Sequence, residues 1–157
     1  DYEGELVIII GKSGKNISSE KAMEHILGYT IGNDVSARIL QFRGSQWILG
    51  KSLDNFAPIG PTIIPPHKFD FESATITTTV NGEVRQQANL NQMIFKPYDI
   101  IAFLSSHMTL QEGDIIFTGT PSGVVLGKNE SKYSWLKLGD TVAITISGIG
   151  TLENKFL

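Results

Sequence analysis

The regular alternation of apolar and polar positions is the clearest signal in the chain, and it predicts a β-hairpin. Residues 74–80 alternate between the two types, Asn81-Gly82 follows, and residues 83–88 return with a second strand pattern. Asn-Gly is typical of a two-residue type I′ turn, because both of its positions take a positive φ. We therefore expect the turn of this hairpin at residues 81–82.

A different pattern predicts a strand that is fully buried. The apolar run from Leu6 to Ile10 is continuous, so we expect a buried strand over residues 5–11. Hydroxyl side chains at Ser18 and Ser19 favour the start of a short helix, which Gly28 ends. The other expected elements are a strand over residues 29–35, a helix from Pro97 to about residue 105, strands over residues 115–119, 141–147 and 150–155, and a long mobile loop over residues 123–135.

Composition supports a fold rich in strands. The chain holds 20 Ile, 12 Thr and 7 Val but only 7 Ala, and β-branched side chains favour the pleated, half-buried surface of a sheet. The predicted strands do not alternate regularly with helices, so we predict an α+β fold that is predominantly β, with two short helices. A chain of 157 residues is long enough for one hydrophobic core, and we expect a single domain over residues 1–157.

Charge and cysteine content exclude several classes of protein. The net charge is −3 and the pI is about 5.6, whereas a surface that binds nucleic acid is basic. The sequence has no cysteine, which excludes disulfides, thiolate zinc sites and cysteine nucleophiles. No apolar run is long enough to cross a bilayer. We expect a cytoplasmic protein that binds neither nucleic acid nor membranes.

Carboxylates near two of the predicted strands are candidate metal ligands. Glu3 and Glu5 stand two residues apart at the start of a strand, so their side chains point to the same face. Asp34 lies at the end of the next strand and can complete a set of three carboxylates for Mg²⁺ or Mn²⁺. The alternative for the two glutamates is a solvated strand edge, and for Asp34 an Asx turn or a helix cap.

Two further segments hold groups that can bind an anionic substrate. Lys51 follows an apolar stretch, where its ammonium group either stabilises a developing enolate beside the acids or extends over the core into solvent. Residues 118–123 are rich in hydroxyl and glycine residues, which suits either a carboxylate-binding loop or an ordinary turn. We interpret His25, His67 and His107 as structural or surface residues, because they are too scattered for a metal pair or a serine triad.

Taken in order, these segments resemble the fumarylacetoacetate hydrolase superfamily over nearly the whole chain. The resemblance rests on seven blocks: residues 1–6 (DYEGEL), 32–38 (GNDVSAR), 50–52 (GKS), 80–83 (VNGE), 93–95 (MIF), 112–116 (EGDII) and 118–121 (TGTP). Seven blocks in one order are far more specific than any single block. The chain looks like the catalytic domain of this superfamily without its N-terminal part.

The resemblance implies a barrel-like fold of mixed sheets and, for most members, a homodimer. It implies a divalent ion, Mg²⁺ or Mn²⁺, bound by Glu3, Glu5 and Asp34, and substrates that are 2-oxo acids or their enols. The positions that the resemblance places in contact with the substrate or the metal site are Arg38, Gln41, Lys51 and Thr120, with Lys51 as the catalytic residue.

The implied chemistry passes through an enolate. A 2-oxo carboxylate chelates a cation through its carboxylate and keto oxygens, and the cation polarises the carbonyl. An enolate stabilised by the cation and by Lys51 serves C–C bond hydrolysis of acylpyruvates, oxaloacetate decarboxylation and enol–keto isomerisation alike. The leading prediction is a metal-dependent C–C hydrolase or decarboxylase. The alternatives are an isomerase or hydratase acting on hydroxymuconate-type dienoates, and a non-catalytic binding or dimerisation module.

Two residues and one segment depart from the family pattern. Ile39 stands where many members carry Asp, and Val125 where many carry Gly, so both are expected to reshape the rim of the pocket. Hydrolytic members activate water with a His–Glu pair that precedes the metal-binding strand. The sequence begins too late to contain this pair, so we expect the natural protein to extend N-terminally and to hold the acid–base group or a lid there.

Overall fold

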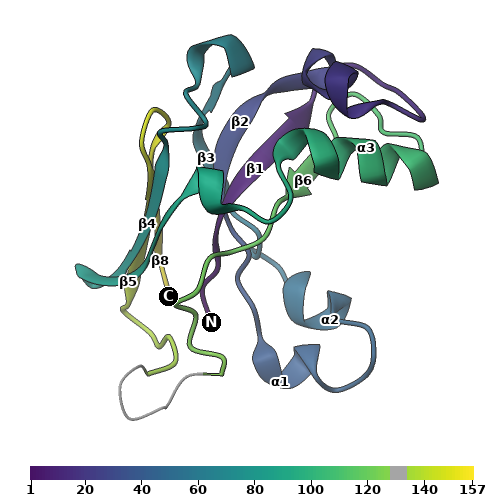
Figure 1. The fold of residues 1–157 in the computed structure, drawn as a ribbon. Coiled ribbons are helices and arrows are strands. Elements are labelled where there is room, and N and C mark those ends of the chain that lie inside the picture. The colour runs from purple at the N-terminus through teal and green to yellow at the C-terminus, as the bar shows by residue number, and fades with distance from the viewer. Residues whose placement is uncertain (128–133) are drawn as a thin grey trace.

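Two four-stranded antiparallel sheets form the body of the protein (Figure 1). The computed structural model describes residues 1–127 and 134–157. The first sheet has the order β3 (Ile59–Ile64), β2 (Ile26–Asn33), β1 (Gly4–Ile10) and β6 (Ile115–Phe117). The second has the order β5 (Glu83–Asn89), β4 (Thr75–Val80), β7 (Thr141–Ile146) and β8 (Gly150–Lys155). The predicted α+β class with a predominance of strands is confirmed.

The helices are short and lie outside the two sheets. The α-helices are α1 (Arg38–Gln41), α2 (Ile48–Lys51) and α3 (Pro97–His107), and the 3₁₀ helices are η1 (Ser19–His25), η2 (Pro66–Lys68) and η3 (Leu90–Gln92). Within the described ranges, no helix combines the length and apolar character needed to cross a membrane. The two predicted helices correspond to η1, which is 3₁₀ rather than α, and to α3.

The sheets differ from the expected mixed sheets. Every strand pair that the structure describes is antiparallel, because the chain connects neighbouring strands by hairpins and loops rather than by parallel crossovers. Among the described residues, no hydrogen-bonded strand pair joins one sheet to the other. Barrel-like closure therefore stays a prediction. The central part of the predicted long loop, residues 128–133, lies outside the described residues.

The predicted hairpin and the predicted buried strand are both present. Asn81 and Gly82 have φ values of +51° and +82°, as a type I′ turn requires, and β4 alternates between half-buried and buried positions. Every residue of β1 is buried. Its even-numbered side chains, Leu6, Ile8 and Ile10, join the core that also contains Ile144 and Ile146 of β7. The core therefore lies between the sheets, with β1 against it.

Gly28 has a different role from the predicted one. It does not end a helix but lies inside β2, where it pairs with Ile9 of β1. A Cβ at this position would approach Ile63 Cγ2 at 2.5 Å and the Ile64 carbonyl oxygen at 2.7 Å. Glycine is therefore needed for β3 to pack closely beside it, and the strand begins at Ile26 rather than at residue 29.

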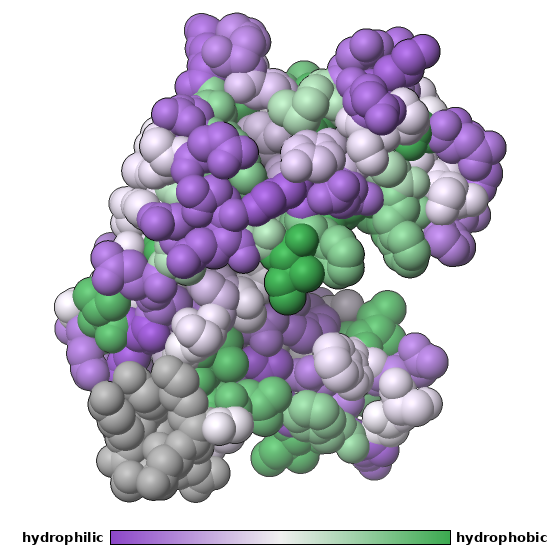
Figure 2. Space-filling view, viewed as in Figure 1, coloured by the Kyte–Doolittle hydropathy of each residue, from purple (hydrophilic) through white to green (hydrophobic). Residues whose placement is uncertain are grey.

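A projecting lobe of the molecule contains two short helices, of which the sequence suggests only the first, through the alternative in which Asp34 caps a helix. The segment after β2 folds into α1 and α2, which lie apart from α3 in Figure 1. Each helix has only four residues, too few for an amphipathic repeat to be visible in the sequence. In Figure 2 the surface is hollowed between this lobe and the part that carries α3, with apolar groups on both sides.

Candidate metal centre

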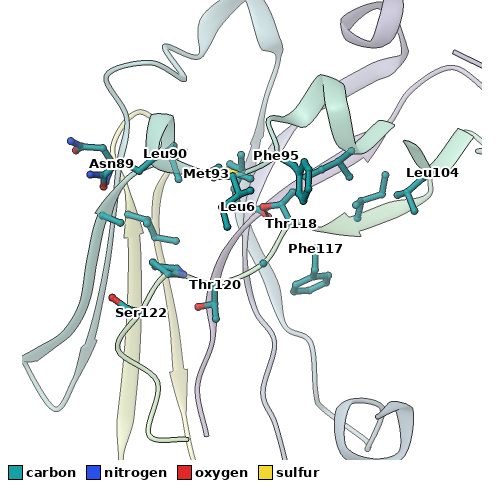
Figure 3. A pocket seen from close by; sticks show the side chains of 18 residues that line it. Leu6, Asn89, Leu90, Met93, Phe95, Leu104, Phe117, Thr118, Thr120 and Ser122 are labelled. Carbon is teal, nitrogen blue, oxygen red and sulfur yellow. Dashed lines mark hydrogen bonds between the residues drawn. The ribbon is translucent and has the colours of Figure 1, made fainter. Parts of the chain in front are cut away.

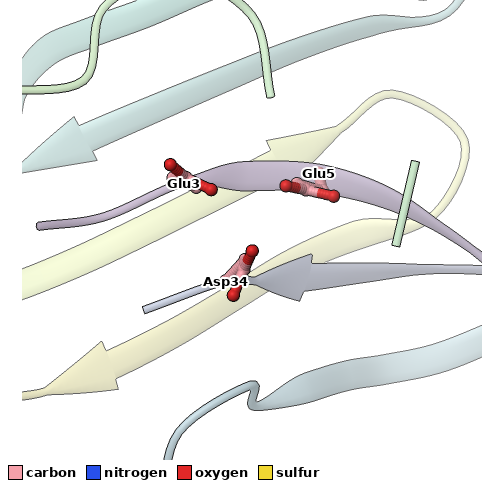
Figure 4. A group of neighbouring side chains, drawn as sticks. All are labelled: Glu3, Glu5 and Asp34. Atoms are coloured by element: carbon pink, nitrogen blue, oxygen red, sulfur yellow. The ribbon is translucent and has the colours of Figure 1, made fainter. Parts of the chain in front are cut away.

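The start of β1 and the end of β2 bring three carboxylates together. Antiparallel pairing places Gly4 opposite Asn33, so the residues just beyond the paired ends are neighbours. The Asp34 backbone N–H donates to the Glu3 carbonyl oxygen at 2.9 Å, which fixes this junction. Glu3, Glu5 and Asp34 each offer a carboxylate oxygen, and these oxygens lie within 4.8 Å of one another (Figure 4). We call these three residues the acidic cluster.

Two cations from the helical lobe are held against the acidic cluster. Lys51, at the end of α2, donates from Nζ to Glu3 Oε2 at 2.7 Å and to Asp34 Oδ2 at 2.6 Å. Arg38, at the start of α1, donates from Nη2 to Glu3 Oε1 at 2.6 Å. Arg38 also donates from Nη1 to Gln41 Oε1 at 2.8 Å, so this buried glutamine holds the guanidinium group in place. The short helices thus present all three side chains to the ends of β1 and β2.

The three carboxyls have different proton affinities. Burial, together with the nearby negative charges of Asp34 and Glu3, raises the pKa of the Glu5 carboxyl to about 8, although a hydrogen bond from Gly119 acts to lower it. Burial and the negative charge of Glu3 raise the pKa of Asp34, although Lys51 opposes them. Burial also acts to raise the pKa of Glu3, but hydrogen bonds from Lys51 and Arg38 outweigh it and the net shift is downward.

This donor set fits a divalent cation. Mg²⁺ and Mn²⁺ prefer carboxylate oxygens, and the acidic cluster supplies three such groups from two adjoining strands. Lys51 contacts both Glu3 and Asp34, and Arg38 contacts Glu3. The Glu5 side chain receives, from the described residues, only the Gly119 N–H at 2.7 Å. A cation among the three groups would take the place of the proton that burial keeps on Glu5 near neutral pH. The residues present therefore suit Mg²⁺ or Mn²⁺.

The segment after β6 closes the site from the side of β1. Thr118 donates from its hydroxyl to the Leu6 carbonyl oxygen at 2.9 Å, and Gly119 follows with a φ of +97°. Thr120 donates from Oγ1 to the Gly4 carbonyl oxygen, also at 2.9 Å. We call residues 118–123 the hydroxyl loop. Its geometry places Thr120 beside the backbone that joins Glu3 to Glu5.

Two cavities are lined by segments that adjoin the acidic cluster, although the carboxylates of the cluster line neither. The larger, of about 650 Å³, is lined mainly by apolar side chains such as Leu90, Met93 and Phe95, and the hydroxyl loop forms one of its walls (Figure 3). The smaller, of about 550 Å³, is lined by Arg38 and Ile39 among others. Such volumes suit small organic ligands. The larger cavity thus borders the hydroxyl loop and the smaller one borders Arg38, and both of these contact the acidic cluster or the backbone beside it.

The structure brings together all seven residues singled out in the sequence, and their functional roles stay predictions. These residues are Glu3, Glu5, Asp34, Arg38, Gln41, Lys51 and Thr120. The histidines make other contacts: His25 bonds the Lys12 carbonyl oxygen, His107 bonds that of Phe103, and His67 is exposed in η2. These contacts agree with structural or surface roles.

The two departures from the family pattern lie in unlike surroundings. Ile39 is 89% exposed on α1 and lines the smaller cavity, as expected for a residue of the rim. Val125 is buried and packs in the hydrophobic core. The expectation that Val125 reshapes the rim is therefore corrected, since its side chain points into the core.

Two residues at the site escaped the sequence analysis. Asp1 accepts bonds from Arg38 Nε and Nη2 at 3.0 and 2.8 Å, and from the backbone N–H groups of Val125 and Leu126 at 3.0 Å. Gln86, on β5, bonds Gly4 and Thr120. The partners of both residues are distant in sequence, so spacing gives no signal. The only available signal is a glutamine at an inward-facing position of a predicted hairpin strand.

Comparison with known proteins agrees with this geometry. The family model described as fumarylacetoacetate (FAA) hydrolase C-terminal matches residues 1–157. The chain is 50% identical to oxaloacetate tautomerase YisK of Bacillus subtilis and 44% identical to the human mitochondrial oxaloacetate tautomerase FAHD2A. The matches cover 99% of this chain but 51% and 50% of those proteins. The chain thus spans about half the length of these relatives.

Solved structures share both the fold and much of the sequence. A fumarylacetoacetate hydrolase from Exiguobacterium antarcticum superposes with a TM-score of 0.94 at 44% identity, over 99% of this chain and 55% of that one. A 5-carboxymethyl-2-hydroxymuconate delta-isomerase from Mycobacterium smegmatis superposes with a TM-score of 0.89 at 42% identity, over 99% and 58%. The family model covers the chain from end to end. This chain belongs to the fumarylacetoacetate hydrolase family.

Proposed function

We propose that the chain carries the metal and substrate site of an enzyme that interconverts the enol and keto forms of a 2-oxo acid, with oxaloacetate as the first candidate. The observation that carries the proposal is the acidic cluster with Lys51 Nζ between Glu3 and Asp34. Two relatives at 50% and 44% identity are named as oxaloacetate tautomerases, and a structural neighbour is named as an isomerase. Enol–keto exchange is thereby favoured over C–C hydrolysis and decarboxylation, which share the enolate.

The acidic cluster is the part of the site that would hold the cation. Mg²⁺ or Mn²⁺, when bound, supplies Lewis-acid polarisation of a keto oxygen. Glu3, Glu5 and Asp34 are the ligands. Their carboxyls differ in protonation because their surroundings differ. Glu3 is kept ionised by Lys51 and Arg38, whereas the raised pKa of Glu5 means that a cation must displace a proton there near neutral pH.

Lys51 and Arg38 are the positively charged side chains at the acidic cluster that would bind an anionic substrate. The Lys51 ammonium group is held within hydrogen-bond distance of two ligands, so its charge lies where negative charge develops on an enolate oxygen. Arg38 has five N–H donors, of which four are used by Asp1, Glu3 and Gln41. Within residues 1–127 and 134–157, the second Nη1 hydrogen has no acceptor, and we assign it to a substrate carboxylate.

A spectroscopic assay tests the proposal directly. Enolic oxaloacetate absorbs in the ultraviolet, so its conversion to the keto form is followed as loss of absorbance in the complete natural protein. We expect acceleration with Mg²⁺ or Mn²⁺ that a chelator abolishes. Pyruvate release from the same reaction measures decarboxylation, and cleavage of an acylpyruvate measures C–C hydrolysis.

The outcomes separate the remaining candidates. Acceleration of enol loss without pyruvate formation supports the tautomerase. Pyruvate formation or acylpyruvate cleavage at a higher kcat/KM would replace it with a decarboxylase or hydrolase that uses the same cluster. No turnover of any substrate, together with no binding of Mn²⁺, would favour the non-catalytic binding module.

A further inference from the structure

Gln86 is a buried amide in the second sheet that reaches the site in the first. It lies on β5 with 1% of its surface exposed, opposite Thr78 of β4. In the described part of the chain its side chain makes three hydrogen bonds, and none of them is to a residue of its own sheet. A buried side-chain amide with both its oxygen and its nitrogen bonded fixes the relative positions of the segments that it joins.

The oxygen of Gln86 holds the backbone between the two glutamates of the acidic cluster. Oε1 accepts the N–H of Gly4 at 3.0 Å. A Cβ on Gly4 would approach Thr78 Oγ1 at 2.3 Å, so only glycine lets β1 come this close to the second sheet. Gly4 therefore connects Gln86 with the positions of Glu3 and Glu5.

The nitrogen of Gln86 holds the hydroxyl loop. Nε2 donates to Thr120 Oγ1 at 2.8 Å and to the Pro121 carbonyl oxygen at 2.8 Å. Thr120 Oγ1 donates in turn to the Gly4 carbonyl oxygen, which closes a ring of hydrogen bonds through Gln86, Gly4 and Thr120. The loop also packs on β5, since a Cβ on Gly123 would approach the Arg85 carbonyl oxygen at 2.2 Å and Gln86 Cγ at 2.8 Å.

We propose that Gln86 is a positioning residue that sets the hydroxyl loop against the acidic cluster and thereby tunes binding of the substrate's carboxylate end. The inference rests on the proposed function of the cluster. An amide is required, because one acceptor must meet Gly4 while two donors meet Thr120 and Pro121. The cluster keeps other supports, since Asn33 Oδ1 accepts the Glu3 N–H at 3.2 Å and Thr118 is bonded to Leu6. Gln86 therefore acts on the loop more than on the metal ligands.

Calorimetric titration of the complete natural protein tests the proposal. The probes are Mn²⁺ alone and then oxalate at saturating Mn²⁺, because oxalate is a planar mimic of the enolate of pyruvate. In Gln86→Met we expect oxalate affinity to fall about 10- to 100-fold, as for removal of other outer-shell hydrogen bonds. Mn²⁺ affinity should fall much less, because Asn33 and Thr118 still support the backbone of the acidic cluster. Gln87→Met is the matched control, since Gln87 is the exposed neighbour on the same strand.

A second variant keeps the test informative if Gln86→Met does not fold. Gln86→Glu keeps the size and the acceptor oxygen but, when ionised, loses both donors to the loop, and we expect the same loss of oxalate affinity. A double-mutant cycle with Thr120→Val then tests whether Gln86 changes oxalate affinity through Thr120. If Gln86 acts through Thr120, the second substitution adds much less in the Gln86→Met protein than in the wild type.

The results that overturn the inference differ from those that overturn the proposed function. A wild-type protein that binds neither Mn²⁺ nor oxalate removes the proposed function, and this inference with it. A wild-type protein that binds both, with unchanged oxalate affinity in Gln86→Met and Gln86→Glu, removes the inference alone. Full additivity with Thr120→Val does the same, because it would mean that Gln86 acts independently of the hydroxyl loop.

Discussion

The two ends of strand β1 differ in the kind of contact that holds them in place. From Leu6 to Ile10 the strand is buried in an apolar core, and its contacts require only that neighbours be apolar and fit. At its start, Glu3 is bonded by Arg38 of α1 and Lys51 of α2, and Glu5 by the Gly119 N–H of the hydroxyl loop, so these contacts require particular polar groups. The comparison teaches that one strand serves as a packing element at one end and as a site scaffold at the other. Damage to the two ends should therefore produce different phenotypes.

Asp34→Ala should have the largest effect, and it should be confined to the site. The substitution removes one of three carboxylates and one of two partners of Lys51. We expect metal-dependent turnover to fall about a thousandfold or more, since the cation's charge stabilisation is worth several kcal/mol. Thermal unfolding should change little, because Asp34 is only partly buried. Turnover close to that of the wild type would remove Asp34 from the metal site.

Ile8→Ala should have the converse effect. Ile8 is fully buried in the core end of β1, so truncation should cost about 2–5 kcal/mol of unfolding free energy through lost contacts and a cavity. Chemical denaturation measures this loss, and Leu138→Ala, at a side chain that is 79% exposed, is the control. The protein that remains folded should keep the kcat of the wild type. A large fall in kcat at unchanged stability would contradict the division of β1 into two functional ends.

The core end of β1 was predictable from the sequence, whereas the site end was only partly so. A continuous apolar run and an Asn-Gly turn are local signals, and both produced the expected elements. The three carboxylates were identifiable because Glu3 and Glu5 share a strand face and Asp34 follows a strand. Their convergence depends on pairing between β1 and β2, which spacing alone does not establish.

What escaped prediction depends on contacts between segments distant in sequence. Four-residue helices such as α1 and α2 are held by tertiary contacts, so their local sequence carries little signal. The sequence favours Gly28 as a helix stop because glycine commonly ends helices, yet the close approach of β3 is what requires glycine there. Asp1 and Gln86 reach partners more than 30 residues away, and only the folded chain shows them.

Lys51→Met separates charge stabilisation from metal binding at the site end of β1. The ammonium group contacts Glu3 and Asp34. Because it is itself a cation, it competes with Mn²⁺ for these two carboxylates. We expect kcat to fall about a hundredfold, the effect of losing one preorganised charge-stabilising group. Mn²⁺ affinity, measured by calorimetry, should not fall. A loss of Mn²⁺ affinity with preserved kcat would assign Lys51 to holding the ligands in place rather than to the reaction.

Stability of the metal-free protein should depend on pH through the buried carboxyl of Glu5. The folded pKa of Glu5 is about 8 against an ordinary value of 4.5, so between these pH values the folded protein holds a proton that the unfolded chain has released. Unfolding free energy should therefore decrease as pH rises from about 5 to 8. Asp34, whose pKa is also raised, contributes in the same direction, whereas the lowered pKa of Glu3 acts only in more acidic solution.

Denaturation at a series of pH values measures this slope, and two changes should flatten it. Glu5→Gln removes the titrating group, while Glu153→Gln, at an exposed glutamate of β8, controls for the loss of one carboxyl. Saturating Mg²⁺ should flatten the slope in the wild type, since a cation favours the ionised carboxylate that burial opposes. An equal slope in Glu5→Gln and the wild type would show that burial at the site end of β1 does not govern the charge of Glu5.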